Sequence, residues 1–162
     1  MIATKYTLSQ KALISFSNFM VWASSGIVVG ITAFFLDKYP HDQHLIFELV
    51  IAALTLGFWI PSFILPFLPS YRSFYVAPNF IFSYLWVTSF IFAAQDYNES
   101  SCSLNAPTGG SCSLKLTSEA FIFLAFIFSI IATVVDAWAW KTANVVVAAE
   151  LVHSDKPGPA VA

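Results

Sequence analysis

The chain has 162 residues, of which 58% are hydrophobic and only 10% are charged. A soluble globular domain carries roughly 25% charged residues, so this sequence has too few charges to present to water. The net charge is −2 and no cluster of basic residues occurs, which excludes the electrostatic pattern of a nucleic-acid-binding protein. A mean hydropathy of +0.75, with the apolar residues gathered in long blocks, predicts an integral membrane protein.

Four apolar blocks are long enough to cross a bilayer as helices. A hydrocarbon core of about 30 Å needs about 20 helical residues, and a spanning segment must satisfy its own backbone polar groups. We expect spans at about residues 12–36, 45–69, 73–95 and 119–140. The predicted fold is therefore an all-α membrane protein, a bundle of four transmembrane helices over residues 12–140.

The basic residues predict the orientation of these spans. With four spans, one side of the membrane carries Lys5, Lys11, Arg72, Lys141 and Lys156, and the other carries Lys38 and Lys115. Because basic segments stay preferentially in the cytoplasm, we expect residues 1–11 and the tail of residues 141–162 to be cytoplasmic. Residues 142–152 of that tail are compatible with a helix. The first block is longer than the apolar core of a cleavable signal peptide, about 7–15 residues, so we expect it to be retained.

Both cysteines, Cys102 and Cys112, fall in the longest polar loop. The expected topology places this loop outside the cytoplasm, where disulfides form, and the Pro- and Gly-containing residues 107–110 would turn the chain back between them. We therefore expect a disulfide, with two unrelated thiols as the alternative. We expect no metal site, because two cysteines without a nearby histidine fall short of four ligands. Asn98 begins a glycosylation sequon, which we expect to be unused because it lies close to the membrane.

Small residues in the first span predict a helix-packing face. Gly26 and Gly30 form a GxxxG pair, and Ala23 and Ala33 extend it on the same face. Lipid removes the hydrophobic drive between helices, so small residues that allow close approach mark helix contacts. We expect this face to pack inside the bundle, with self-association as the alternative. The fourth span carries a comparable stripe: Ala125, Ser129, Ala132 and Asp136.

Ionisable residues within the spans are candidates for chemistry, because burying a charge there costs at least about 2.5–3.5 kcal/mol on insertion scales. Glu48 and Glu119 lie near the outer ends of their spans, where we expect them to reach the interface. Asp136 lies deeper, and Asn79 is the polar residue expected at a matching depth. A proton or ion relay would use Asp136 and Asn79, whereas the alternative for Asp136 is a structural contact with Lys141 or a neighbouring helix.

Motifs of catalysis are missing from the sequence. The three histidines lie outside the expected spans, and no CxxC pair, HExxH, nucleotide-binding loop or GxSxG elbow occurs. We therefore expect no enzyme, no catalytic residue and no cofactor. Trp22, Trp59 and Trp86 lie nearer the middle of their spans, where we expect them to pack between helices.

The arrangement of spans and loops resembles a known family. Residues 84–94, beginning Tyr84-Leu85-Trp86, lead to the loop with both cysteines and then to residues 119–126, Glu-Ala-Phe-Ile-Phe-Leu-Ala-Phe. This pattern is similar to the fungal MARVEL-domain proteins, including the tetraspan proteins of eisosome-associated microdomains of the plasma membrane.

The resemblance implies a MARVEL four-helix bundle without catalysis. It also implies a role in organising lipid and protein microdomains of the plasma membrane, or in membrane trafficking. The implied partners are membrane lipids, including sphingolipid- or sterol-rich domains, and other membrane proteins or further copies of the chain. The alternative function is a small transporter or channel, or an accessory subunit of a membrane complex, that uses Asp136 and Asn79.

Overall fold

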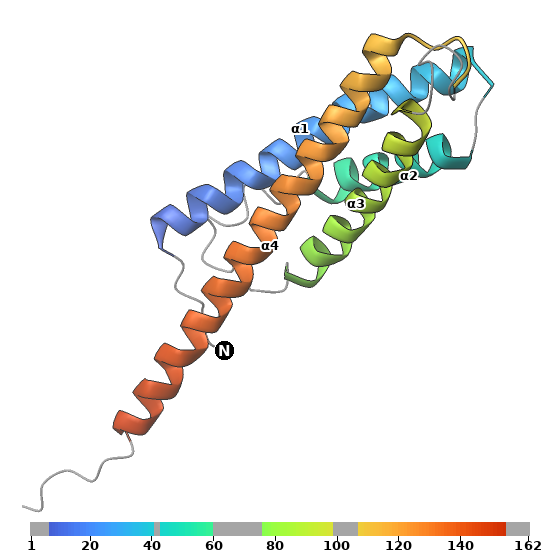
Figure 1. Ribbon diagram of the computed structural model, residues 1–162. Helices are drawn as coiled ribbons and strands as arrows, with labels where there is room; N and C mark the ends of the chain where they lie inside the picture. The colour runs from blue at the N-terminus through green and yellow to red at the C-terminus, as the bar shows by residue number, and fades with distance from the viewer. Residues whose placement is uncertain (1–6, 41–42, 60–75, 99–106, 155–162) are drawn as a thin grey trace, which may run out of the picture.

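The computed structural model describes residues 7–40, 43–59, 76–98 and 107–154. These residues form four helices in chain order: α1 (Leu8–Lys38), α2 (Gln43–Trp59), α3 (Val76–Asn98) and α4 (Cys112–Ser154). Figure 1 shows them as one assembly from which the last part of α4 projects. Since the described residues contain no strand, the prediction of an all-helical fold is confirmed.

Three of these helices are long and apolar enough to cross a membrane. They are α1, α3 and the part of α4 over Cys112–Thr142. The fourth, α2, is equally apolar but has 17 residues, fewer than the about 20 that a span needs. The structure therefore indicates a helical membrane protein with three candidate spans. The rest of the expected second span, and the start of the expected third, fall within residues 60–75, outside the described residues.

The start of α1 is set by a capping box rather than by the first apolar residue. The Gln10 backbone N–H donates to Thr7 Oγ1 at 3.3 Å, and the Thr7 backbone N–H donates to Gln10 Oε1 at 2.9 Å. These two bonds satisfy backbone donors that a helix start leaves without partners. The helix thus begins before residue 12, where the apolar block predicted the span to begin.

A tight turn sets the start of α4. The Gly110 backbone N–H donates to the Pro107 carbonyl oxygen at 3.0 Å, and Gly109 has φ of 82°, a conformation that favours glycine. A Cβ on Gly110 would lie 3.0 Å from Lys115 Cε, so Gly110 leaves room for that side chain. The helix begins directly after this turn, ahead of the predicted residue 119, and continues through the residues of the tail that were expected to be helix-compatible.

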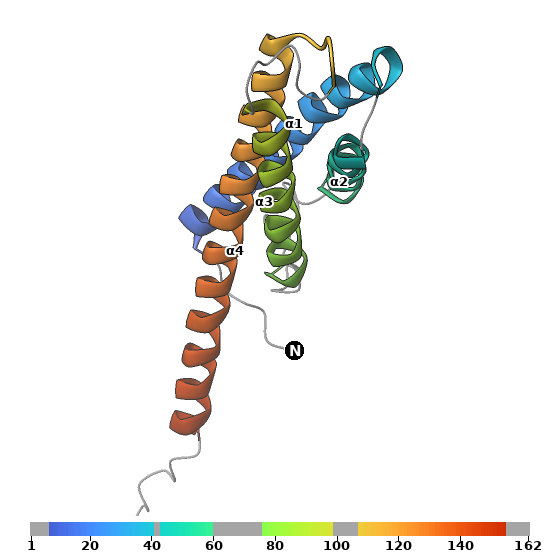
Figure 2. The same ribbon diagram turned by 45° about the vertical axis from the view of Figure 1, so that its right-hand side comes forward.

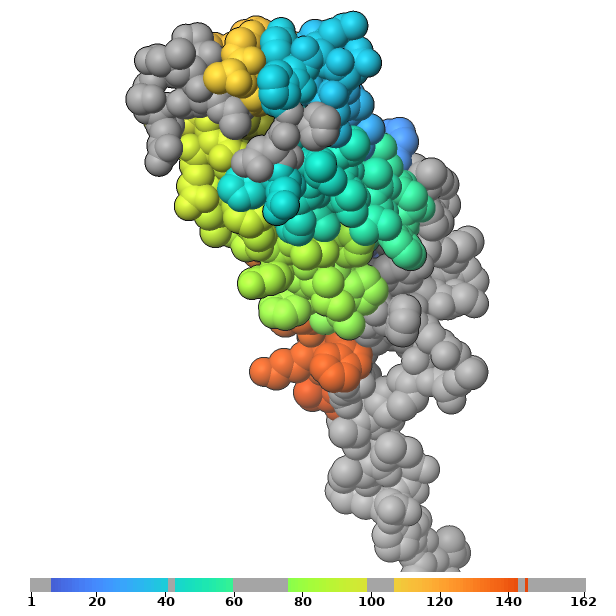
Figure 3. Space-filling view, turned by 90° about the vertical axis from the view of Figure 1, so that its right-hand side faces the viewer, coloured from blue at the N-terminus to red at the C-terminus, as the bar shows by residue number. Residues whose placement is uncertain are grey.

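The four helices pack on one another to different extents. α4 packs along both α1 and α3, and these are the two most extensive contacts, whereas the contact between α2 and α3 is the smallest. Figure 2 shows α2 nearly end-on, whereas α3 and α4 are seen along their length, so α2 crosses them at a steep angle. On the face shown in Figure 3, α2 lies between the end of α1 and α3. A four-helix bundle is therefore not confirmed.

The apolar core joins all four helices. Trp86 of α3 is completely buried and belongs to a cluster that includes Val28 of α1, Ala52 of α2 and Ile122 of α4. Large apolar side chains also cover the outside, as Phe80 does on α3 with 64% of its surface exposed. An apolar exterior is expected where lipid rather than water surrounds the helices.

Replacing Trp86 with alanine tests this core. Because the side chain is completely buried, we expect Trp86→Ala to lower the free energy of unfolding by about 3–5 kcal/mol, the usual cost of truncating a large aromatic core residue. The matched control, Phe80→Ala on the same helix, removes an exposed ring and should cost less than about 0.5 kcal/mol. Unfolding of the purified protein in mixed detergent measures both, and equal losses would contradict the placement of Trp86.

Candidate functional site: buried polar contacts between helices

Polar side chains lie buried at both ends of the helical assembly. The last residues of α1 and α3 and the first residues of α2 and α4 lie at one end of the assembly, which we call the loop end. We call the other end the opposite end. Among the buried residues are two carboxylates, Asp136 of α4 and Glu48 of α2. A polar group that is buried without a hydrogen bond is costly, so the partners of these groups define the architecture of the interior.

At the opposite end, Asp136 and Asn79 are in direct contact. Asn79 Nδ2 donates to Asp136 Oδ2 at 3.0 Å, and both side chains are buried. The sequence analysis placed these two residues at a matching depth, and the structure brings them together. The bond links α3 to α4 and is charge-assisted when Asp136 is ionised. The arrangement can anchor the two helices, and it is also the arrangement that a proton or ion relay would need.

Trp59 ties the end of α2 to two other helices. Its Nε1 donates to Asn18 Oδ1 of α1 at 3.3 Å. Its ring lies 4.7 Å from that of Phe82 on α3, in an edge-to-face geometry that aromatic pairs favour. Trp59 and Trp86 are both buried, which confirms that they pack between helices. Trp22 is partly exposed.

At the loop end, His44 joins the start of α2 to α3. Its ring stacks on that of Phe92 with the centroids 4.2 Å apart and the planes within 1° of parallel. His44 Nδ1 lies 3.1 and 3.2 Å from the two carboxylate oxygens of Asp96. Phe92 and Asp96 are one helical turn apart, so they present an aromatic face and an acceptor side by side. This contact holds α2 against α3 where their packing is otherwise slight.

Glu48 lies inside the assembly rather than at the interface where it was expected. Only 1% of its surface is exposed, and it accepts a hydrogen bond from Tyr97 Oη of α3 at 3.3 Å. The contact with Tyr97 shows that Glu48 lies on the side of α2 that faces α3, so packing between the two helices accounts for the difference. Glu48 and Tyr97 therefore form a second polar link between these two helices.

Asn98 and Glu119 join the last residue of α3 to α4. Asn98 Nδ2 donates to Glu119 Oε1 at 2.9 Å. Asn98 is the asparagine of the sequon, and its amide, the group that would carry a glycan, is engaged by the carboxylate. The rest of the sequon lies outside the described residues, so the absence of a glycan on Asn98 stays a prediction.

The small-residue face of α1 is largely exposed, and of its two glycine positions only that of Gly26 comes near another described helix, at Leu56 of α2. Gly26, Gly30 and Ala33 are exposed, and Ala23 is partly exposed. A Cβ on Gly30 would have no neighbour within 4 Å, and one on Gly26 would only touch Leu56 at 3.9 Å. This face was expected to pack inside the bundle, but most of it is exposed at the surface of the assembly.

A different face of α1 packs inward, and it carries hydroxyl groups. Ser25 Oγ donates to the Val21 carbonyl oxygen and Thr32 Oγ1 to that of Val28, each at 2.7 Å. Such bonds satisfy a hydroxyl within its own helix and still leave the side chain small enough for close packing. The comparable stripe of α4 behaves as expected, because all four of its residues are buried: Ala125, Ser129, Ala132 and Asp136.

Cys112 begins α4, and no cysteine in the described part of the chain is free. Its expected partner, Cys102, lies outside the described residues, so the pairing stays a prediction. Within the described ranges, no group of three or more His, Cys, Asp or Glu side chains is placed to hold a metal ion.

Sequence reasoning missed three polar residues of the loop end. His44 and Asp96 looked like loop residues because they flank the apolar blocks, and Tyr97 carried no signal that would distinguish it from an interfacial tyrosine. Lys115 was also taken as a loop residue, yet it is buried in the first turn of α4. The spacing of Phe92 and Asp96 by one turn was the available clue to a partner for His44.

Comparison with known proteins adds no relative: no family model matches the chain, and neither a curated protein nor a solved structure is detectably similar to it.

A double-mutant cycle tests the contact between Asn79 and Asp136. Interhelical hydrogen bonds in membranes contribute about 0.6 kcal/mol on average and up to about 1.7 kcal/mol. We expect Asn79→Ala and Asp136→Ala to show a coupling toward the upper end of that range, because the acceptor is a carboxylate. Detergent unfolding of the wild type, both single variants and the double variant gives the value.

The control cycle pairs Asp136→Ala with Thr55→Ala. Thr55 is buried in α2 and donates to its own helix, to the Ile51 carbonyl oxygen, so its loss should add to that of Asp136 without coupling. A coupling near zero for Asn79 and Asp136 would show that their bond does not stabilise the protein.

Proposed function

We propose that the protein is a non-enzymatic organiser of membrane domains, of the MARVEL type. It gathers lipids and other membrane proteins, or further copies of itself, into sphingolipid- or sterol-rich microdomains of the plasma membrane or into trafficking carriers. The MARVEL assignment, the four spans and the plasma-membrane location rest on the resemblance of the sequence. A disulfide between Cys102 and Cys112 in an outer loop belongs to the same proposal.

The observation that carries this proposal is the outward face of α1. Gly26 and Gly30 are exposed on a candidate membrane span, and a GxxxG face allows another helix to approach the backbone closely. Several inward polar groups, by contrast, bond to another helix of the same chain, as Asn79 does to Asp136 and Tyr97 to Glu48. The interior thus supports a scaffold, and the exterior offers a surface for lateral association.

Imaging in the native cell tests the organiser. We expect the fluorescently tagged protein to form stable plasma-membrane patches that redistribute on acute depletion of sphingolipids. Gly26→Ile combined with Gly30→Ile should disperse the patches, because isoleucine side chains prevent close helix approach. These substitutions meet little within the chain, so the variant should keep the wild-type unfolding midpoint.

Gly57→Ile is the matched control. Gly57 is exposed on α2 and also has open space around its Cβ position, but it has no glycine four residues away, so the patches should persist. Uniform fluorescence of the wild type, or patches that ignore lipid depletion, would count against the organiser. Patches that survive both α1 substitutions would remove the GxxxG face from the proposal.

A small transporter or channel is the second candidate, and the contact between Asn79 and Asp136 favours it. The two buried polar groups meet at one depth on α3 and α4, as a proton or cation relay requires. Reconstitution in liposomes with a pH-sensitive dye separates the candidates. A relay would give proton flux that Asp136→Asn abolishes, whereas an organiser gives no flux above that of empty liposomes.

A further inference from the structure

A groove opens between α3 and α4 at the loop end. It encloses about 350 Å³ and is lined by Phe90, Leu116, Glu119, Ala120 and Phe123. Small-molecule sites occupy roughly 300–1,000 Å³, so this groove has room for part of a lipid rather than for a whole one. Its walls are apolar apart from the carboxylate of Glu119.

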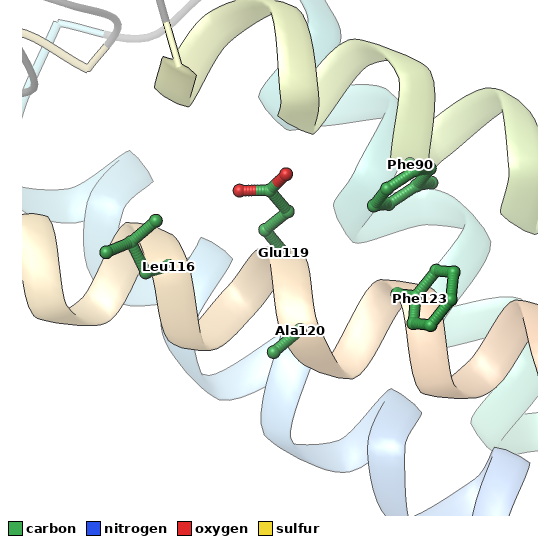
Figure 4. A pocket seen from close by; sticks show the side chains of 5 residues that line it. All are labelled: Phe90, Leu116, Glu119, Ala120 and Phe123. Atoms are coloured by element: carbon green, nitrogen blue, oxygen red, sulfur yellow. The ribbon is translucent and has the colours of Figure 1, made fainter.

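The carboxylate points into the groove. Figure 4 shows Glu119 extending from α4 toward α3, between Leu116 on one side and the rings of Phe90 and Phe123 on the other. The two ring centroids lie 5.3 Å apart, and Leu116 and Phe123 are exposed on the outside of the assembly. The groove is therefore open to the lipid that surrounds α3 and α4.

The depth of the groove suits an amphiphile. Glu119 is hydrogen-bonded to Asn98, the last residue of α3, so the carboxylate lies level with the end of that candidate span. Phe123 lies one turn further along α4, about 6 Å deeper at 1.5 Å per residue. A molecule with its polar head at Glu119 would lay its hydrocarbon chain against the phenylalanine rings.

The charge of this end favours a cationic head. Asp96 and Glu119 both act electrostatically on Glu48, so three carboxylates lie near one another. His44 faces Asp96. Lys115 is the lysine of α4 at this end, one turn before Glu119. A carboxylate offers about four acceptor positions. Within the described residues, Asn98 donates the one hydrogen bond that Glu119 receives, so further acceptor positions face the groove.

We propose that this groove binds a bilayer lipid with a primary ammonium headgroup, of the phosphatidylethanolamine class. The ammonium N–H groups donate charge-assisted hydrogen bonds to Glu119, and an acyl chain packs on Phe90 and Phe123. A quaternary ammonium has no N–H group, so phosphatidylcholine cannot make the same bonds. The inference deepens the proposed function by naming a lipid, and it rests on that function only in requiring the chain to lie in a bilayer.

Native mass spectrometry of the purified full-length chain tests the site. The protein in detergent micelles is titrated with phosphatidylethanolamine or phosphatidylcholine of identical acyl chains. We expect the wild type to prefer phosphatidylethanolamine and Glu119→Gln to weaken its binding about tenfold, as the loss of a charge-assisted hydrogen bond implies. Phe123→Ala should weaken the binding of both lipids, because it removes part of the wall that packs against the chain.

Two matched controls keep the test specific. Asp37→Asn removes an exposed carboxylate at the same end, and Phe80→Ala removes an exposed ring of α3 outside the groove; both should bind like the wild type. Equal binding of the two lipids by the wild type would overturn the proposal, as would an unchanged preference in Glu119→Gln. A lipid-free dimer that Phe123→Ala converts to a monomer would also overturn it, since a second copy would then fill the groove.

The result is separable from the test of the organiser. Patches that ignore sphingolipid depletion, together with an intact preference for phosphatidylethanolamine, would remove the organiser and keep the lipid site. Equal affinities for the two lipids in a protein that still forms lipid-sensitive patches would remove only the lipid site.

Discussion

The structure depends on one constraint: in a bilayer, helices gain no hydrophobic free energy by leaving lipid for one another. Close packing and interhelical hydrogen bonds must therefore hold them together. The bond from Asn79 to Asp136 meets this need between α3 and α4, where neither water nor lipid could satisfy the carboxylate. The long contacts of α4 with α1 and α3 supply the packing, and small residues on the inward face of α4 make those contacts close.

The position of α2 follows from the same constraint. This helix packs on α1 more than on α3, with which its contact is the smallest of the four, so polar and aromatic links add to that contact. His44 stacks on Phe92 at one end, and Trp59 bonds to Asn18 at the other. These links join α3 and α1 to a helix that crosses its neighbours steeply, and Glu48 is buried where α2 faces Tyr97 of α3.

The sequence was sufficient for the properties that depend on composition along one helix. Apolar blocks predicted the helices, and the depth of Asn79 and Asp136 predicted their proximity. The sequence was insufficient for properties that depend on how two helices pack against each other. Nothing local indicates that α2 crosses its neighbours, so the burial of Glu48 and its bond to Tyr97 could not be read from the chain. The same limit applied to α1, which has two faces of small residues. The GxxxG motif predicted packing on the face with Gly26, whereas the face with Ser25 and Thr32 packs inward, with its hydroxyls bonded within the helix.

The two faces of α1 lie on opposite sides of the helix, since residues advance by 100° each along it. One face packs within the chain, and the other, with Gly26 and Gly30, is exposed. The groove at Glu119 lies on α3 and α4 and shares no residue with either face. The lateral association and the lipid binding proposed above would therefore use separate surfaces of one helical assembly. A rigid scaffold of this kind could bring a particular lipid and a particular protein together without a conformational change. The proposed organiser needs only such a scaffold, whereas a transporter must alternate between two conformations.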